Sequence, residues 1–294
     1  MEIKIFDRTK NEYFFEAQYG QKSLRFLYET VLGRILLRLF VSGKIVSKIG
    51  AIRMHSKSSV SQIGPFIKKH GINAEDYEEQ EYKSFSDFFT RKIKEGKRLC
   101  CNDSDALISV ADSKLTYYKI DDDLCFKIKN SIYTVNELIK DDNISEQFKN
   151  GICLIFRLTV DDYHHYCYPD KGKVLFSKKI NGKLHTVSPI SGKRYKVYSE
   201  NCREITLLET ENFGEIIQIE VGAMLVGKIN NKINETFEKG EEKGYFDFGA
   251  STCILLLKNN DIKIDDDIIK NSAKGIETKV LFGEKIGKRK MYND

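Results

Sequence analysis

The sequence predicts an α+β fold, in which a helical N-terminal portion precedes a β-rich body. In the first part of the chain, apolar residues recur at steps of three and four, which is typical of an amphipathic helix. From about residue 105, short apolar runs alternate with turn signals instead. Apolar residues make up 41% of the chain and charged residues 31%, which supports a packed core. We therefore expect a helical region over residues 1–95 and a β-rich region over residues 96–294.

One broad apolar stripe marks the predicted N-terminal helix. Its members lie at helical spacing: Leu24, Leu27, Tyr28, Val31, Leu32, Ile35, Leu36, Leu39 and Phe40. Arg25, Arg34 and Arg38 lie off this stripe. Two interpretations fit the pattern: a helix packed against the core, or a helix that lies in a membrane interface with its basic side toward anionic headgroups. The hydrophobic pattern alone does not separate them.

Three apolar runs predict the central strands of the β-rich body. They are residues 151–158 (GICLIFRL), 215–221 (EIIQIEV) and 253–257 (CILLL). Turn signals separate them at residues 170–172 (DKG), 181–182 (NG) and 212–214 (NFG). One helix is expected within this region over residues 135–149, because Thr134 and Glu137 have the spacing of a capping box.

Composition and spacing exclude several classes of function. A formal net charge of +5 is far below that of a dedicated nucleic-acid binder. The odd number of cysteines, seven, and the charged first residues favour a reducing cytosol over a disulfide framework. The lack of a CxxC pair excludes a zinc-ribbon site. Residues 222–228 (GAMLVGK) match most of a P-loop, but Ile229 stands where Ser or Thr should bind magnesium.

Two further exclusions concern metals and membrane spans. His164, His165 and Cys167 could ligate a metal by residue type, but adjacent residues of a strand point to opposite faces, so we expect no metal site. The apolar stretches are shorter than the roughly 18–20 residues that a spanning helix needs.

Three distant segments place polar residues in apolar surroundings. They are residues 108–115 (ISVADSKL), 162–169 (DYHHYCYP) and 244–252 (GYFDFGAST). Together they supply an acid, an imidazole and a hydroxyl, which are the parts of an activated nucleophile. Asp112, His164 and Ser251 are the candidate catalytic residues. Taken singly, each has a structural explanation, as a turn residue, a core histidine and a cap at a strand start.

Together these segments resemble the phosphatidylserine decarboxylase family, of the bacterial, clostridial-like type. Residues 85–92 are similar to its F-x-x-F-F-x-R segment, 109–112 to S-P-x-D-G, and 162–164 to D-Y-H. Residues 184–189 resemble its S-V-N-P stretch, 201–204 its N-x-R stretch, and 221–227 its V-G-A-x-x-V-G pattern. Residues 239–246 and 248–252 are similar to G-x-E-x-G-x-F followed by G-S-T. The resemblance covers most of the chain and also explains the incomplete P-loop.

The resemblance implies that the protein cleaves itself between Ala250 and Ser251. The Ser251 hydroxyl would attack the carbonyl of Ala250, leaving a β chain (residues 1–250) and an α chain (residues 251–294) that remain associated. Ser251 would become a covalent pyruvoyl cofactor, which forms a Schiff base with phosphatidylserine and yields carbon dioxide and phosphatidylethanolamine. His164 would be the acid/base for both stages, and Asp112 would orient it. The small Ala250 and the flexible Gly249 suit this cleavage.

Three residues depart from the family pattern. Ala250 replaces the usual Gly, Ser113 replaces the Gly that follows the Asp, and Cys167 stands where many members have a second His. The acid/base role therefore lies with His164, His165 or Cys167. The departures also keep open a non-catalytic relative that binds acidic phospholipid. A serine hydrolase using Ser251 is disfavoured, since the chain lacks a G-x-S-x-G elbow.

A lipid substrate favours the membrane interpretation of the N-terminal helix. The resemblance implies a peripheral enzyme at the cytoplasmic face of the cell membrane, with residues 1–95 as the membrane-associating region and residues 96–294 as the catalytic domain. The expected partners are phosphatidylserine, the membrane surface and the two chains of one precursor, without nucleic acid. A homo-oligomer is left open.

Overall fold

The computed structural model describes most of the chain. It covers residues 2–16, 21–37, 52–128, 131–187, 190–191, 195–223, 228–249, 251–258 and 262–290. Ala250, on the N-terminal side of the expected cleavage point, lies outside the described residues, as do Arg38, Leu39 and Phe40 of the predicted helix.

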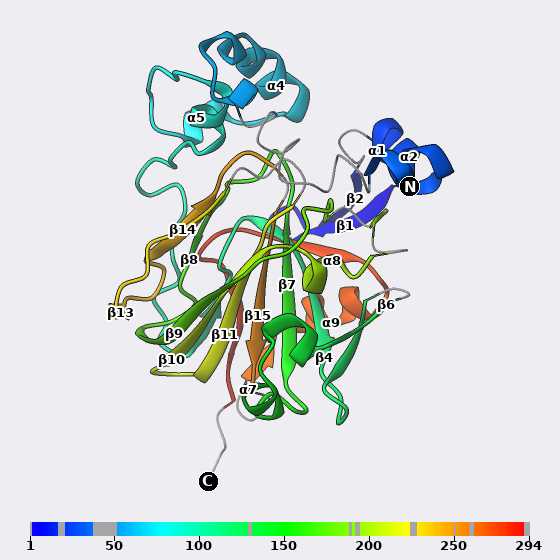
Figure 1. The fold of residues 1–294 in the computed structure, drawn as a ribbon. Coiled ribbons are helices and arrows are strands. Elements are labelled where there is room, and N and C mark those ends of the chain that lie inside the picture. Colours follow the sequence, from blue (N-terminus) through cyan, green and yellow to red (C-terminus); the bar gives the residue numbers. More distant parts are fainter. Residues whose placement is uncertain are drawn as a thin grey trace.

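A ten-stranded sheet forms the centre of the molecule (Figure 1). In spatial order its strands are β13 (Thr236–Phe237), β9 (Gly172–Ile180), β10 (Arg203–Thr210), β11 (Gly214–Val221), β15 (Ser251–Leu257), β7 (Ile152–Leu158), β4 (Ser113–Lys119), β17 (Glu277–Val280), β1 (Ile3–Asp7) and β2 (Glu12–Glu16). Neighbouring strands run antiparallel, except that β1 and β17 are parallel. The sheet and the N-terminal helices confirm the predicted α+β class.

Both faces of this sheet are covered, which explains why every residue of β7 and β15 is buried and most of them are apolar. One face packs on short sheets and a helix: β12 (Ile229–Asn231), β14 (Glu242–Phe246), β8 (His165–Cys167), β16 (Ile262–Ile264), β18 (Lys285–Arg289), β3 (Ala106–Ile108) and α9 (Asp266–Ala273). The other packs on β5 (Cys125–Ile128), β6 (Ser131–Thr134), α6 (Val135–Ile139) and α8 (Val197–Glu200). A strand between two apolar layers has no polar face to present.

A further group of helices lies before residue 90. They are α1 (Gln21–Glu29), α2 (Val31–Leu36), the 3-10 segments Lys57–Gln62 and Ala74–Asp76, α4 (Ile63–His70) and α5 (Phe85–Phe89). Phe66 of α4 and Phe85, Phe88 and Phe89 of α5 form a separate apolar cluster, against which Phe248 packs. This cluster joins the N-terminal helices to the segment that precedes Ser251.

The N-terminal region differs from the expected all-helical one. Residues 3–16 form a hairpin, and its strand β1 joins the large sheet beside β17. The alternation of buried and exposed residues in β1 is the strand signal, with Ile3, Ile5 and Asp7 buried and Lys4 exposed. The predicted helix over residues 24–40 is interrupted at Thr30, whose side chain caps α2 by accepting from the Gly33 N–H at 2.9 Å.

The helix predicted over residues 135–149 is two helices instead of one. The Thr134–Glu137 capping box is present, which confirms the start of α6. Lys140 then adopts a left-handed conformation (φ 55°), which ends α6. Asp141 caps a second helix, α7 (Asp142–Glu146), by accepting from the Ile144 N–H at 3.1 Å. A second capping residue inside the pattern therefore restarts the helix in a new direction.

Candidate active site

Ser251 begins β15, at the centre of the large sheet. Its side chain is fully buried, and its Oγ lies 3.5 Å from the Gly249 carbonyl oxygen. Cys253 and Leu255 belong to the core on the face covered by β8 and β14. Because side chains alternate along a strand, Ser251 faces β8 and β14, and Thr252 faces the opposite side. Gly249 has φ 139°, a conformation that L-residues rarely adopt, as the glycine there led us to expect.

His164 lies directly against the segment that leads to Ser251. Its main-chain carbonyl accepts a hydrogen bond from the N–H of Phe246, the last residue of β14, at 3.0 Å. Its ring packs on Phe89 with centroids 4.0 Å apart, and Phe89 contacts Phe248 at 5.1 Å. The fold therefore brings His164 and Ser251 to the same side of the large sheet, from positions 87 residues apart.

The surroundings of His164 keep its ring neutral. Burial, and then the positive charge of Arg91, lower the pKa of His164 to about 3. Nδ1 lies 3.0 Å from the main-chain oxygen of Asp162. Nε2 is buried, and it has no hydrogen-bond partner among the described residues. A neutral imidazole with one open nitrogen can accept a proton from a hydroxyl.

Arg91, in the segment similar to F-x-x-F-F-x-R, is the positive charge that acts on His164. Its side chain is fully buried over the rings of Tyr77 and Phe88, at 4.3 and 4.8 Å from the centroids. Its guanidinium also donates to the main-chain oxygens of Asp161 and Asp162, at 3.2 and 3.4 Å. Helix α5 thus supplies the Phe89 ring against His164, and the chain just beyond the end of α5 supplies the cation near it.

Asp112 does not contact His164. Its carboxylate accepts from Arg98, through Nη2 at 2.7 Å and Nε at 3.0 Å, and from the Phe282 N–H at 2.7 Å. In the described part of the chain, the expected Asp112–His164 contact is replaced by these bonds. Asp112 is buried and its charge is paired with Arg98. Its proposed role in orienting His164 therefore stays a prediction.

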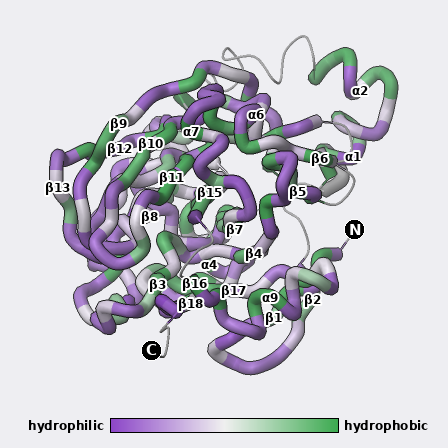
Figure 2. The backbone as a smooth tube through the Cα atoms, turned by 90° about the horizontal axis from the view of Figure 1, so that it is seen from below, coloured by the Kyte–Doolittle hydropathy of each residue, from purple (hydrophilic) through white to green (hydrophobic). Residues whose placement is uncertain are grey.

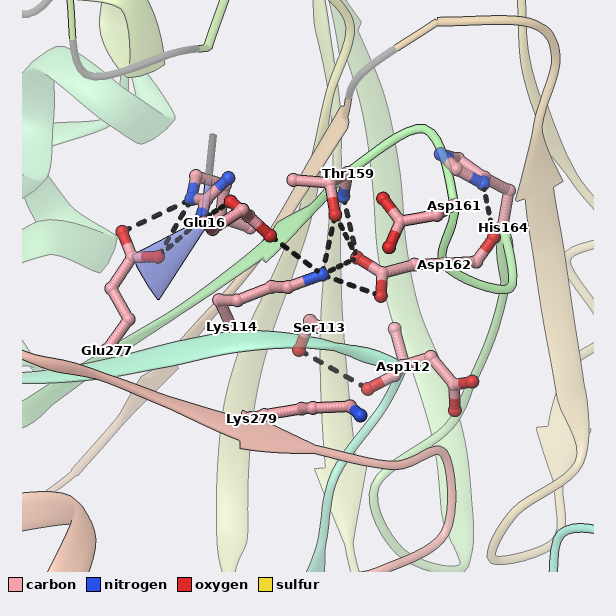
Figure 3. Close-up of polar contacts among 12 residues, drawn as sticks. Glu16, Asp112, Ser113, Lys114, Thr159, Asp161, Asp162, His164, Glu277 and Lys279 are labelled. Carbon is pink, nitrogen blue, oxygen red and sulfur yellow. Dashed lines mark hydrogen bonds and ion pairs between the residues drawn. The ribbon is translucent and has the colours of Figure 1, made fainter. Parts of the chain in front are cut away.

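Sequence reasoning missed Asp162, the acid nearest to His164 along the chain. Its carboxylate accepts from Lys114 Nζ at 2.8 Å, from the Thr159 N–H at 2.7 Å and from the Thr159 hydroxyl at 2.9 Å (Figure 3). Burial raises the pKa of Asp162 to about 6, with Lys114 opposing that rise. A lysine next to the apolar Leu115 in β4 was the sequence signal for this pair.

His165 and Cys167 occupy structural positions. His165 is stacked between Tyr163 and Tyr245, and its nitrogens lie 2.8 Å from Glu242 Oε2 and 3.1 Å from the Thr90 carbonyl. Burial raises the pKa of the Cys167 thiol well above its ordinary value, which disfavours the thiolate. Its sulfur lies 3.8 Å from the Ser109 carbonyl oxygen. His164 is therefore the candidate base with an open nitrogen.

Comparisons with known proteins show the family of this chain. A model of the phosphatidylserine decarboxylase family matches residues 85–288. The phosphatidylserine decarboxylase proenzyme 2 of Clostridium acetobutylicum is 58% identical over 98% of this chain and 99% of its own length. The proenzymes of Clostridium beijerinckii and Clostridium botulinum (strain Langeland) are 39% and 40% identical, over 97% and 98% of this chain and 98% and 100% of theirs. The chain belongs to the phosphatidylserine decarboxylase family.

Proposed function

We propose that this protein is a phosphatidylserine decarboxylase made as a proenzyme, which cleaves itself between Ala250 and Ser251. The observation that carries the proposal is that a buried Ser251 at the start of β15 and a neutral His164 lie on the same side of the sheet. The family relationship and the proenzyme names of the relatives agree with it.

The first stage is a rearrangement of the backbone. Nε2 of His164 takes the Ser251 hydroxyl proton while Oγ attacks the Ala250 carbonyl carbon, and the peptide bond is exchanged for an ester. Loss of the α-proton of residue 251 then expels the Ala250 carboxylate as the new C-terminus of the β chain. The remaining enamine takes up water and releases ammonia, which leaves a pyruvoyl group at position 251. Ser251 fits as its precursor because it begins β15, two residues after Gly249, whose φ is unusual.

The second stage is the decarboxylation of phosphatidylserine. When formed, the pyruvoyl group supplies a carbonyl that binds the substrate amine and accepts the electrons left as carbon dioxide departs. His164 is placed to hold or return a proton at Nε2, because that nitrogen is open and the ring is neutral. The product is phosphatidylethanolamine.

We further propose that the enzyme works as a peripheral protein at the cytoplasmic face of the membrane. Three apolar side chains of α2 support this placement: Val31 is 68% exposed, Leu32 60% and Ile35 49%. Figure 2 shows α2 at the edge of the molecule. Solvent-exposed apolar residues beside Arg34 suit an anionic lipid surface better than a core-packed helix. In the described part of the chain, no helix is both long and apolar enough to cross a bilayer.

The intact mass of the purified protein tests this function. Wild type should separate into chains of 250 and 44 residues, with a pyruvoyl group at the start of the shorter one, and should release carbon dioxide from phosphatidylserine vesicles. Ser251→Ala should remain one inactive chain of 34.0 kDa.

Thr252→Ala is the matched control, because Thr252 is the adjacent buried hydroxyl and faces the other side of the sheet. It should cleave like wild type. An intact, inactive wild type that still binds acidic vesicles would instead support the non-catalytic relative.

A further inference from the structure

One hydrogen bond decides which nitrogen of His164 can act as a base. Nδ1 lies 3.0 Å from the Asp162 main-chain oxygen, and a carbonyl oxygen can only accept. The hydrogen of the neutral ring therefore lies on Nδ1, and the lone pair lies on the open Nε2. If the Asp162 carbonyl turned away, the ring could take the other tautomer and lose its basic nitrogen at that position.

The peptide that carries this carbonyl is held by its own side chain. Thr159 and Asp162 close a turn, in which the Asp162 N–H donates to the Thr159 oxygen at 3.0 Å. The Asp162 carboxylate accepts from the Thr159 N–H and hydroxyl and, through both its oxygens, from Lys114 Nζ. Among the described residues, the hydrogen bonds to this carboxylate come from Thr159 and Lys114.

Lys114 ties this turn to the large sheet. It lies on β4, opposite Arg157 of β7, and its side chain is 3% exposed. Burial alone would lower the pKa of Lys114, but Asp162, Asp161 and Glu16 outweigh burial and raise it, so the ammonium stays charged. Figure 3 shows Lys114 reaching from β4 to Asp162, below the loop that carries His164.

We propose that Lys114 is a positioning residue for His164, acting through the carboxylate and the main-chain carbonyl of Asp162. Lys114 and Thr159 fix the Asp162 peptide, and that peptide fixes the Nδ1–H tautomer of His164. This inference rests on the proposed function for its effect on self-cleavage, but its effect on the imidazole can be measured in uncleaved protein.

Arg157 is the matched control for Lys114. The Arg157 side chain is also buried, at 7% exposure, and like Lys114 it forms an ion pair with Glu16. Its other ion pair is with Glu277 instead of Asp162. Removing either cation leaves a buried carboxylate without its partner, so both variants should lose stability. Of the two variants, Lys114→Met alone also removes the lysine that donates to the Asp162 carboxylate.

The rate of self-cleavage is the first measurement. Newly made protein is followed by intact mass for wild type, Lys114→Met, Lys114→Arg and Arg157→Met. We expect Lys114→Met to slow cleavage by about tenfold or more, a part of what a general base contributes. Lys114→Arg should recover much of the rate, and Arg157→Met should stay within about threefold of wild type. Equal slowing in Lys114→Met and Arg157→Met would overturn the proposal.

The tautomer of His164 is the second measurement. Uncleaved Ser251→Ala protein with ¹⁵N-labelled histidine should give the Nδ1–H pattern for His164, assigned by its loss in His164→Gln. Adding Lys114→Met should move that signal toward mixed tautomers, whereas adding Arg157→Met should not. An unchanged His164 signal in Lys114→Met would refute the proposed positioning role of Lys114. If Lys114→Met fails to fold, Thr159→Val, which keeps Lys114, replaces it in both measurements. A wild type that never cleaves would defeat the proposed function and leave the tautomer result standing.

Discussion

His164 and Asp162 are buried side by side, and burial shifts their pKa values in opposite directions. Burial lowers the pKa of His164 to about 3 and raises the pKa of Asp162 to about 6, because in each case it disfavours the charged form. At neutral pH the imidazole is uncharged and the carboxylate is ionised. This combination gives a base at His164 and a charged group for Lys114 to hold.

The stability of the uncleaved protein should reveal the shift at His164. Between its folded pKa of about 3 and the ordinary 6.5, the unfolded chain binds the proton more tightly, so this contribution to stability is lost as pH falls from 6.5. The contribution of Asp162 to stability has the opposite pH dependence between pH 3.8 and about 6, because the folded protein binds this proton more tightly than the unfolded chain.

In the Ser251→Ala background, His164→Gln should therefore lower the slope of unfolding free energy against pH, by up to about 1.4 kcal/mol per pH unit between pH 4 and 6. Urea unfolding of the variant and its Ser251→Ala parent at several pH values measures this slope. Identical slopes would show that His164 is not buried in its neutral form.

Cys167 should be dispensable for cleavage. Its thiol is fully buried and neutral, with a sulfur contact to the Ser109 carbonyl. Cys167→Ala should cleave within about threefold of wild type and lose about 1 kcal/mol of stability, as expected for removing one buried heavy atom.

Cys153→Ala provides the control, because Cys153 is an equally buried thiol on β7 that faces the other core. Both variants should lose similar stability and cleave alike, as measured by intact mass and thermal melting. Cleavage slowed a hundredfold in Cys167→Ala alone would make Cys167 part of the chemistry.

For individual residues, the sequence identified the candidate catalytic residues but not their hydrogen-bond and ion-pair partners. Ser251 and His164 stand in short polar segments with a family resemblance, and the fold places them on the same side of the sheet. The contact between Lys114 and Asp162 joins residues 48 positions apart, so it could not be read from spacing. The ion pair between Arg98 and Asp112 likewise forms only on folding. Through it, the carboxylate that was expected to contact His164 binds Arg98 instead.

Among the secondary-structure elements, strands with strong local patterns were predicted best. The runs at residues 151–158, 215–221 and 253–257 correspond to β7, β11 and β15, with bounds that differ by one or two residues. Their continuous apolar sequence reflects burial on both faces. The β1–β2 hairpin was missed because its strands are five residues each and β1 depends on β17, from the far end of the chain.

The exposed side of α2 should govern membrane binding. We expect Val31→Gln, Leu32→Gln and Ile35→Gln together to lower binding to vesicles containing phosphatidylserine at least tenfold. Each apolar side chain would contribute up to about 1.5–3 kcal/mol when fully buried in lipid, and glutamine keeps the helix.

Leu175→Gln on β9, which is 42% exposed, is the control and should bind like wild type. Vesicle co-sedimentation gives the affinities, and the melting temperature should change little because these side chains contact solvent. Unchanged binding of the triple variant would place the membrane contact elsewhere.

In the whole molecule, the expected α chain is built into the central sheet and into the layer that covers one of its faces. Its strand β15 lies between β11 and β7, β17 lies between β4 and β1, and β16 and β18 complete the sheet with β3. Cys253, Ile254, Leu255, Leu256 and Leu257 are all fully buried. Burial of that area and the backbone bonds on both sides of β15 hold the two chains together without a covalent link.

The two chains should therefore elute together. Size-exclusion chromatography of cleaved protein in native buffer should give one peak containing both chains, and only denaturant should release the 44-residue piece. Free short chain under native conditions would contradict this arrangement. Uncut Ser251→Ala protein on the same column provides the reference position.

The central position of β15 also means that the cut protein should refold less readily than the uncut chain. Before the cut, the middle strand finds its neighbours as part of one polymer, at the high effective concentration that a covalent tether provides. Afterwards the same strand belongs to a separate short peptide, so reassembly from the denatured state becomes a bimolecular encounter that dilution opposes. If the chain is cut as proposed, the mature protein should keep its shape through a barrier to unfolding more than through an ability to refold.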